Sequence, residues 1–175
     1  MMEQEKLKNY LKVISPIKIE EDVSTRLEVS NHLRKYDCAV LFNHIKEYPS
    51  WNIVGNICTS RRVFADMLTV PTNLLLDTLA EAMNRPTKYG KVSDAGFLKN
   101  EIEVKNIKKR IPLVMFYPEK ERYYSSATIF LAIDPDTGQQ NASFHRMMHL
   151  NGNRFSVRVV PRDLFNIYDK NKQKG

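Results

Sequence analysis

The chain has 175 residues, of which 42% are apolar, enough to bury a hydrophobic core in one large domain or two small ones. It contains no run of eighteen apolar residues and begins without the apolar core of a signal peptide, so we expect no membrane span and no secretory leader. Cys38 and Cys58 have no metal-site spacing and predict reduced thiols in a cytoplasmic protein.

The net charge of +7 raises the question of nucleic-acid binding. Basic residues cluster in 105–110 and again in 170–174, but neither cluster interleaves the aromatic residues that stack on bases. We therefore interpret the charge as a solvated face and a frayed basic tail, and regard nucleic acid as an unlikely partner. The same charge also favours an acidic or phosphate-bearing small ligand.

The first half of the chain alternates helix and strand signals. Apolar residues at helical spacing, Ser24 and Ser60 as N-caps, and Pro71 in a first helical turn mark the helices. The helices are expected at residues 2–14, 24–36, 60–67 and 71–84, and the strands at 17–20, 39–42 and 51–57.

The second half predicts an antiparallel meander after an irregular connection at residues 85–100. Strands are expected at 101–107, 113–117, 124–133, 139–150 and 154–160, followed by a helix at 163–170. The predicted fold class is α+β. An α/β portion at 1–100 precedes an antiparallel β-barrel at 101–163, and a short helix with a basic tail occupies 164–175.

The strand at 139–150 carries an unusual set of polar residues. Period two places Asn141, Ser143 and His145 on one face, and Phe144 and Arg146 on the other, which its apolar residues predict to be the core face. A buried Arg146 needs an anion, because an unpaired buried charge is costly. That anion is an internal carboxylate or a bound carboxylate or phosphate, unless the side chain reaches solvent at an edge.

Several segments in a fixed order resemble one enzyme family. These are Ala39–Tyr48, Trp51–Asn56 with Ser60-Arg61, and Tyr124–Leu164 with its D-P-x-T-G-x-x-N and H-R-M-M motifs. The set resembles the N-terminal half of the UbiD-like decarboxylases, which use prenylated flavin mononucleotide (prenylated FMN). The resemblance extends over nearly the whole chain and implies that the barrel is a split β-barrel of the flavin-binding type.

The resemblance also implies roles for individual residues. Arg146 matches the catalytic arginine that holds the substrate carboxylate. Asn141 matches a ligand of a divalent metal, Mn²⁺ or Mg²⁺, that bridges to the phosphate of prenylated FMN or FMN, and Asp163 stands where a second ligand, usually His, is expected. The residues expected along the cofactor are Asn141, Ser143, Phe144, His145, Arg146 and Arg162. A bulge or barrel curvature must bring Asn141 and Arg146 to one cofactor.

Members of that family are far longer than this chain, and their third metal ligand and catalytic glutamates lie in a C-terminal domain. The resemblance therefore implies a decarboxylase component, a lyase, that acts on an unsaturated or aromatic carboxylic acid. We expect it to be the N-terminal subunit of a split enzyme, inactive without a separate C-terminal subunit, and to form a homo-oligomer. The alternative is a non-catalytic flavin-binding or scaffold protein of the same fold.

Overall fold

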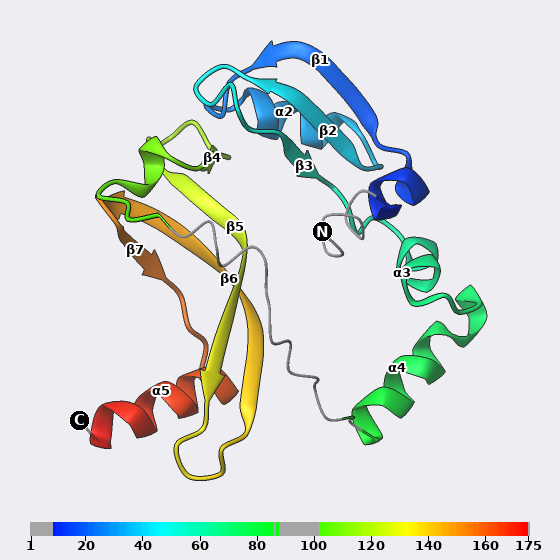
Figure 1. Ribbon diagram of the computed structural model, residues 1–175, viewed down its shortest axis with the longest axis vertical. Helices are drawn as coiled ribbons and strands as arrows, with labels where there is room; N and C mark the ends of the chain where they lie inside the picture. The colour runs from blue at the N-terminus through cyan, green and yellow to red at the C-terminus, as the bar shows by residue number, and fades with distance from the viewer. Residues whose placement is uncertain (1–8, 86, 88–101, 175) are drawn as a thin grey trace. The chain divides into compact units, whose positions relative to one another are not determined.

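The computed structural model describes residues 9–85, 87 and 102–174 (Figure 1). The chain divides into two compact units. The first comprises Met1–Val23 and Asn31–Glu103, and the second comprises Ser24–Ser30 and Val104–Gly175. The predicted division into 1–100, 101–163 and 164–175 stays a prediction. No helix of the described ranges is long and apolar enough to cross a membrane.

The first unit contains a three-stranded sheet in the order β1-β2-β3. Strand β1 (Ile17–Val23) runs parallel to β2 (Val40–Ile45), and β3 (Ile53–Gly55) runs antiparallel to β2. The helix α2 (Glu28–Lys35) lies between β1 and β2 in the sequence, as a parallel crossover requires. Val40, Phe42 and Ile45 of the central strand are almost completely buried, which gives this sheet its core.

The C-terminal part of α2 packs against this sheet (Figure 1). The His32 ring meets Phe42 edge-on at 5.8 Å between ring centroids. At the end of β3, Gly55 leaves room for the methyl groups of Leu33, which a Cβ atom would overlap. Asn56 follows with a φ of 54° and donates from Nδ2 to the Leu33 and Tyr36 carbonyls at 2.7 and 2.9 Å. These bonds satisfy carbonyls that the end of α2 leaves without helical partners.

Several helices accompany this sheet among the described residues of the first unit. Residues 9–14 are helical, and the Tyr10 hydroxyl donates to the Ile57 carbonyl at 2.6 Å. Burial raises the Tyr10 pKa, and the nearby Cys58 adds to the increase. The Ser60 hydroxyl caps α3 (Arg61–Leu68) by accepting from the Val63 amide. After Pro71 the chain forms a 3-10 turn, η1 (Thr72–Leu74), and then α4 (Leu75–Asn84).

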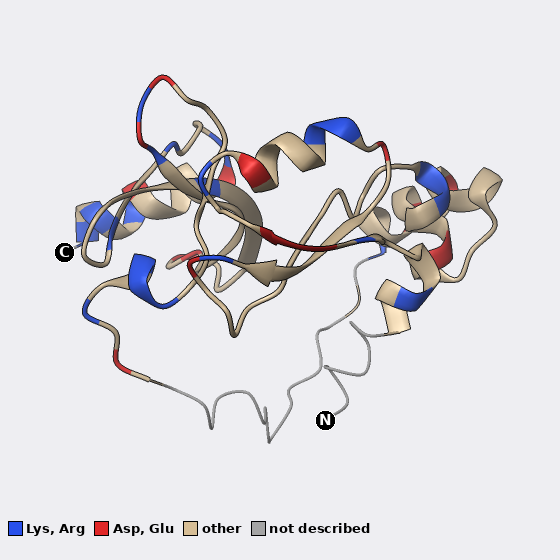
Figure 2. Ribbon diagram, turned by 90° about the horizontal axis from the view of Figure 1, so that it is seen from above, with Lys and Arg blue, Asp and Glu red and all other residues tan. Residues whose placement is uncertain are grey.

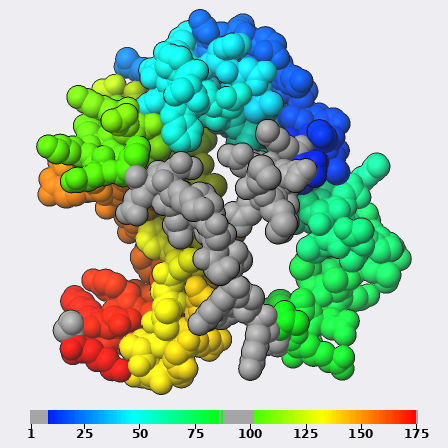
Figure 3. Space-filling model, viewed as in Figure 1, coloured from blue at the N-terminus to red at the C-terminus, as the bar shows by residue number. Residues whose placement is uncertain are grey.

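The second unit is an antiparallel sheet in the order β4-β5-β6-β7, with one helix after it. Two long strands, β5 (Tyr123–Ile133) and β6 (Gln140–Asn151), form its centre. The short strands β4 (Val114–Met115) and β7 (Arg154–Val157) are the edges of the described sheet. The helix α5 (Asp163–Lys174) contacts both β5 and β6 (Figures 1 and 3).

A small apolar core lies at one end of this second sheet. It consists of Leu113, Met115 and Tyr123, with the partly buried side chains of Leu27, Ile107, Ile111 and Phe155 packed against it. The Met115 amide donates to the Thr25 carbonyl at 2.9 Å, which holds the segment 24–30 against β4. The far end of the β5–β6 ribbon takes no part in this core.

The α+β class and the antiparallel sheet are confirmed, and most predicted elements occur with shifted ends. The predicted strand at 101–107 is wrong for its described part, because residues 102–106 form no strand and Ile107–Lys109 form the 3-10 turn η3. The helix expected from Ser24 begins at Glu28, because Leu27 adopts a φ of 70° that helices exclude. The connection predicted at 85–100 lies, except for residues 85 and 87, outside the described residues.

The basic residues that raised the nucleic-acid question lie on separate elements of the second unit (Figure 2). Lys108 of η3 places its ammonium group 3.4 Å from the centroid of the Tyr123 ring. The expected frayed tail is instead the helix α5, which continues to Lys174, and its Lys170 is paired with aspartates. Several of these cations are therefore engaged within the protein.

Candidate functional site

The strand β6 carries a ladder of polar side chains on its partly buried face. The Asn141 amide donates from Nδ2 to the Ser143 hydroxyl at 3.4 Å, and that hydroxyl lies 3.0 Å from His145 Nε2. The His145 ring also meets Phe130 of β5 edge-on, with 5.2 Å between centroids. Alternation along the strand thus brings Asn141, Ser143 and His145 together, as the sequence predicts.

A cavity of about 510 Å³ lies where the β5–β6 hairpin meets α5. The two predicted metal ligands, Asn141 and Asp163, both lie in its wall, although one comes from a strand and the other from a helix. The other lining residues are polar, except for one buried isoleucine. They are Asp134, Gln139, Gln140, Asn166, Ile167, Asp169, Lys170 and Gln173.

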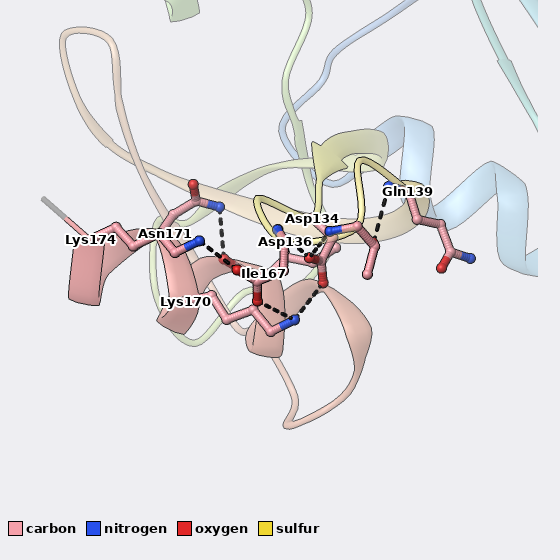
Figure 4. A network of polar contacts seen from close by, with 8 residues as sticks. Asp134, Asp136, Gln139, Ile167, Lys170, Asn171 and Lys174 are labelled. Atoms are coloured by element: carbon pink, nitrogen blue, oxygen red, sulfur yellow. Dashed lines mark hydrogen bonds and ion pairs between the residues drawn. The ribbon is translucent and has the colours of Figure 1, made fainter.

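A network of charged side chains ties α5 to the hairpin turn beside this cavity (Figure 4). Lys170 Nζ lies 2.7 Å from Asp134 Oδ2 and 3.1 Å from an Asp136 oxygen, and Lys174 also pairs with Asp136. The other Asp134 oxygen accepts from the Asp136 and Thr137 amides at 2.8 and 3.1 Å. One carboxylate therefore both closes the turn and holds the helix.

This network shifts the pKa values of its members. The hydrogen bond from Lys170, followed by that from the Asp136 amide, lowers the Asp134 pKa from 3.8 to about 2. Hydrogen bonds from Lys174 and then Lys170 lower the Asp136 pKa, and the two aspartates raise the Lys170 pKa. All three groups are therefore charged at neutral pH.

The oxygen donors of the cavity suit a hard divalent cation. The Asn141 side-chain oxygen and the Asp163 carboxylate are ligands of the kind that Mg²⁺ and Mn²⁺ bind. Neither accepts a side-chain hydrogen bond from the described residues. Those residues contain no cluster of three or more His, Cys, Asp or Glu that could hold a metal on its own. Asn141 and Asp163 can thus supply two ligands of a metal, and a bound phosphate can supply others.

Arg146 does not lie on a buried face, and that expectation is corrected. The strand β6 buries the side of Asn141, Ser143 and His145, and exposes the side of Phe144 and Arg146. Phe144 is 72% exposed, because no described element of the second unit covers that side of the strand. Arg146 forms no ion pair with a described residue, so the internal carboxylate considered as its partner is not found among them.

A bulge lies opposite Arg146, but it does not bring Arg146 and Asn141 to one face. The register of β5 with β6 changes between the pairs Ser125–Met147 and Thr128–His145, so two β5 residues face Arg146. The hydroxyls of Ser125 and Thr128 lie 2.7 Å apart across the bulge. Because the extra residue belongs to β5, the alternation of β6 is unbroken. Asn141 and Arg146 therefore stay on opposite faces.

Large apolar side chains accompany Arg146 on the exposed face of the β5–β6 ribbon. Ile129 is paired with Phe144 across the two strands, and both are more than half exposed. We call this surface the apolar ribbon face, and define it by Ile129, Leu131, Ile133, Phe144 and Leu150. Exposed apolar side chains gathered on one face of a ribbon are typical of a binding or association site.

Sequence reasoning missed part of the site. It did not single out Asp134 for its contact with Lys170, nor Asn166 and Asp169 as cavity residues. The spacing of Lys170 and Lys174, one helical turn apart, was a usable signal for two cations on one helix face. The predicted cofactor residues Ser143, Phe144, His145 and Arg162 lie outside the cavity wall, and their roles stay predictions.

The fold and the polar strand define a class of protein, namely an α+β protein with a β-α-β unit and an antiparallel ribbon that carries a potential cation site. Two family models match the chain. The 3-octaprenyl-4-hydroxybenzoate carboxy-lyase N-terminal domain matches residues 17–83, and the Rift-related domain of the same carboxy-lyase matches residues 90–175. The chain belongs to this family, the UbiD family, as its motifs predict.

Curated relatives carry one shared name. The anhydromevalonate phosphate decarboxylase of Methanothermobacter thermautotrophicus is 31% identical over 173 residues, which is 97% of this chain and 40% of that protein. The anhydromevalonate phosphate decarboxylase of Methanosarcina mazei is 24% identical over 160 residues, covering 91% of this chain and 36% of that protein. The chain thus spans about two fifths of the length of the curated relatives that it matches.

Solved structures of the UbiD class share the fold. The UbiD-class enzyme HmfF of Pelotomaculum thermopropionicum, in complex with FMN, has a TM-score of 0.87 and 25% identity, covering 98% of this chain and 40% of that one. An evolved dimeric form of that enzyme, in complex with prenylated FMN, has the same TM-score and 26% identity, covering 98% and 41%. The closed form of vanillic acid decarboxylase from Sedimentibacter hydroxybenzoicus has a TM-score of 0.80 at 20% identity, covering 96% and 40%.

Proposed function

We propose that this chain is the flavin-binding component of a UbiD-type decarboxylase that removes CO₂ from an unsaturated or aromatic carboxylic acid. The observation that carries the proposal is the shared cavity of Asn141 and Asp163 in a member of this family. Both FMN and prenylated FMN occur in the similar HmfF structures, and the curated relatives named above are decarboxylases.

In this proposal Asn141 and Asp163 hold Mn²⁺ or Mg²⁺, which neutralises the flavin phosphate beside an otherwise acidic cavity wall. Ser143, Phe144, His145 and Arg162 lie along the cofactor. When bound, prenylated FMN supplies the electron sink that the loss of CO₂ requires. The guanidinium of Arg146 orients the substrate carboxylate through charge-assisted hydrogen bonds.

The relatives point to a narrower substrate class. Three curated matches share the name anhydromevalonate phosphate decarboxylase, which denotes an acid that also carries a phosphate group. A chain with a net charge of +7 favours such an anionic ligand. A phosphorylated unsaturated acid is therefore the first substrate to test, ahead of aromatic acids.

A partner that carries the rest of the family's length, whether a separate polypeptide or a further domain, is proposed to complete the enzyme. The relatives extend well beyond the two fifths of their length that this chain matches, and Arg146 has no carboxylate partner among the described residues. The apolar ribbon face suits such a partner, because covering Leu131 and Phe144 removes exposed apolar area from water. Association into a homo-oligomer and a cytoplasmic location, with Cys38 and Cys58 as free thiols, belong to the same proposal.

The decisive experiment co-expresses the chain with a flavin prenyltransferase and the polypeptide that carries the remaining part of the family's length. Absorbance and mass spectrometry of the purified complex identify the cofactor, and CO₂ release from a phosphorylated unsaturated acid measures turnover. Arg146→Ala should abolish turnover while cofactor content is kept. Arg110→Ala, an exposed arginine of the same unit, is the matched control. Full turnover in Arg146→Ala contradicts the assignment.

Partner docking is tested separately by a charge on the apolar ribbon face. Leu131→Asp should abolish co-purification of the second polypeptide, because a carboxylate cannot be buried there without a partner. Leu76→Asp on α4 introduces the same charge at a leucine of similar exposure, 60% against 67% for Leu131, and should leave co-purification intact. If Leu131→Asp and Leu76→Asp co-purify with the second polypeptide to the same extent, the proposed docking face is contradicted.

The alternative function is that of a flavin-binding or scaffold protein without catalysis. One observation favours it, namely that no described carboxylate faces Arg146 as an acid-base partner. It predicts flavin in the purified complex and no CO₂ release from any acid tested. The same co-expression experiment therefore separates the two functions.

A further inference from the structure

The separation of Asn141 and Asp163 depends on how α5 is held against the β5–β6 hairpin. Asn141 is near the start of β6, and Asp163 is the first residue of α5. Nothing within either element controls the distance between the two side chains. The contacts between α5 and the hairpin must therefore set the geometry of the cavity that both residues line.

Those contacts include a small set of ion pairs, and one isoleucine of α5 is buried. Ile167 is only 7% exposed and anchors the middle of α5, but an apolar contact does not define the rotation of a helix sharply. Lys170 lies about two turns beyond Asp163 and reaches Asp134 and Asp136 together, at 2.7 and 3.1 Å (Figure 4). Two acceptors on one ammonium group restrict both the rotation and the position of the helix.

A continuous chain of hydrogen bonds links Lys170 to the strand that bears Asn141. Asp134 receives Lys170 on Oδ2 and closes the turn by accepting two amides on Oδ1. Its own amide donates to the Gln139 carbonyl at 2.9 Å, just before β6 begins. The Asp134 carboxylate is 16% exposed, so this contact is shielded more than that of Lys174 with Asp136, where the exposed fractions are 54% and 47%.

We propose that Lys170 is a positioning residue of the cation site, which holds α5 against the Asp134 turn so that Asn141 and Asp163 stand at the separation that a divalent cation needs. The inference rests on the proposed function, because it names the residue that organises the same site. In this proposal Lys170 is not itself a ligand of the cation. Its contribution is geometric, since exposed ion pairs add little to stability.

The charge of Lys170 and its positioning role predict opposite effects on cation binding. Removing a positive charge from the cavity wall strengthens the attraction of a cation by Coulomb's law. Losing the helix contact misplaces a ligand, and loss of a supporting contact lowers metal affinity about 10- to 100-fold. The direction of the change in Lys170→Met therefore distinguishes the two roles.

The test measures Mn²⁺ affinity by electron paramagnetic resonance, on the co-expressed complex with FMN bound. Lys170→Met should weaken Mn²⁺ binding about tenfold, whereas Lys170→Arg should restore most of it, because Arg can span the same two carboxylates. Lys172→Met is the matched control: it removes the same charge from an exposed site two residues away and should not weaken binding. Thermal unfolding of all variants should stay close to that of the wild type.

Two failures are distinguishable. If the wild-type complex binds FMN but no Mn²⁺, the proposed cation site is wrong, and the role of Lys170 falls with it. If the wild type binds Mn²⁺ and Lys170→Met binds it equally well or more tightly, only the positioning role is overturned. Weaker binding in both Lys170→Met and Lys172→Met also overturns it, because the loss would then not depend on the contact of Lys170 with Asp134 and Asp136.

Discussion

The two sheets of this protein bury their apolar residues to very different extents. In the β1-β2-β3 sheet, Phe42 is completely buried and its neighbours on β2 complete a core. In the β4-β5-β6-β7 sheet the apolar ribbon face is largely exposed, with Leu131 at 67%. The hydrophobic core of the first sheet is complete within its own unit. The second presents an apolar surface that the described residues leave open.

The first sheet therefore contributes mainly to stability, whereas the exposed face of the second sheet is available for binding. Residues of a finished core are needed for folding, whereas residues of an open apolar face contribute little until something covers them. Arg146 lies on the open face and Asn141 on the partly buried one. The two proposed roles, orientation of the substrate by Arg146 and binding of a cation by Asn141, thus fall on two sides of one ribbon with different requirements for burial.

The sharpest test of this comparison substitutes one phenylalanine in each sheet. Phe42→Ala should lower the free energy of unfolding by about 3–5 kcal/mol, because it leaves a cavity in a closed core. Phe144→Ala should change it by less than about 0.5 kcal/mol, because its ring is already in water. Urea unfolding followed by circular dichroism measures both. Similar losses in the two variants would show that the ribbon face is covered in the isolated chain.

Gly55 tests how tightly the first sheet packs on α2. Gly55→Ala should cost about 1–3 kcal/mol of unfolding free energy, because the new methyl group overlaps the Leu33 side chain. Fluorescence of Trp51, which lies in the same unit, follows the transition. The double variant Gly55→Ala with Leu33→Ala should show a smaller loss than the sum of the two single variants. A loss of unfolding free energy in the double variant equal to the sum of the two single losses would argue against the contact between Gly55 and Leu33.

The Ser60 cap is expected to have a smaller effect in the same unit. Ser60→Ala removes the hydroxyl that accepts from the Val63 amide at the start of α3, which costs about 1 kcal/mol. Ser60→Asp keeps an acceptor at that position and should retain most of the wild-type stability. Urea unfolding followed by Trp51 fluorescence measures both variants, and equal stability of Ser60→Ala and the wild type would contradict the cap.

The smallest expected effect is a titration in the second unit. Because Lys170 and two amides favour the ionised form, the Asp134 pKa is about 2 rather than 3.8. The contribution of this carboxylate to stability is therefore fully present above pH 3.8 and is lost as the pH falls through about 2. Carbon-13 NMR of the carboxyl group should show this low pKa, and Lys170→Met should raise it. A wild-type value near 3.8 would contradict the network.

Local signals in the sequence predicted much of the fold. These signals are Pro71, Ser60 and the turn 134–138, and each acts on residues close to it in the sequence. The local structure that they form can therefore be predicted without knowledge of the tertiary structure. The alternation that groups Asn141, Ser143 and His145 is equally local. Gly55 and Asn56 carry no such local signal and enter the sequence analysis only within the segment Trp51–Asn56 of the family resemblance. Their physical role, room for Leu33 and capping of α2, depends on contacts more than twenty residues apart in sequence.

The sequence by itself determined the family, the α+β class and the alternation of β6, because motifs, composition and strand periodicity are properties of neighbouring residues. Tertiary structure alone decided which face of β6 is partly buried, since the face with more apolar residues, that of Phe144 and Leu150, is the exposed one. It also decided that α5 brings Asp163 and Lys170 to the hairpin turn. Burial and long-range ion pairs depend on which elements meet, and a linear pattern does not encode that.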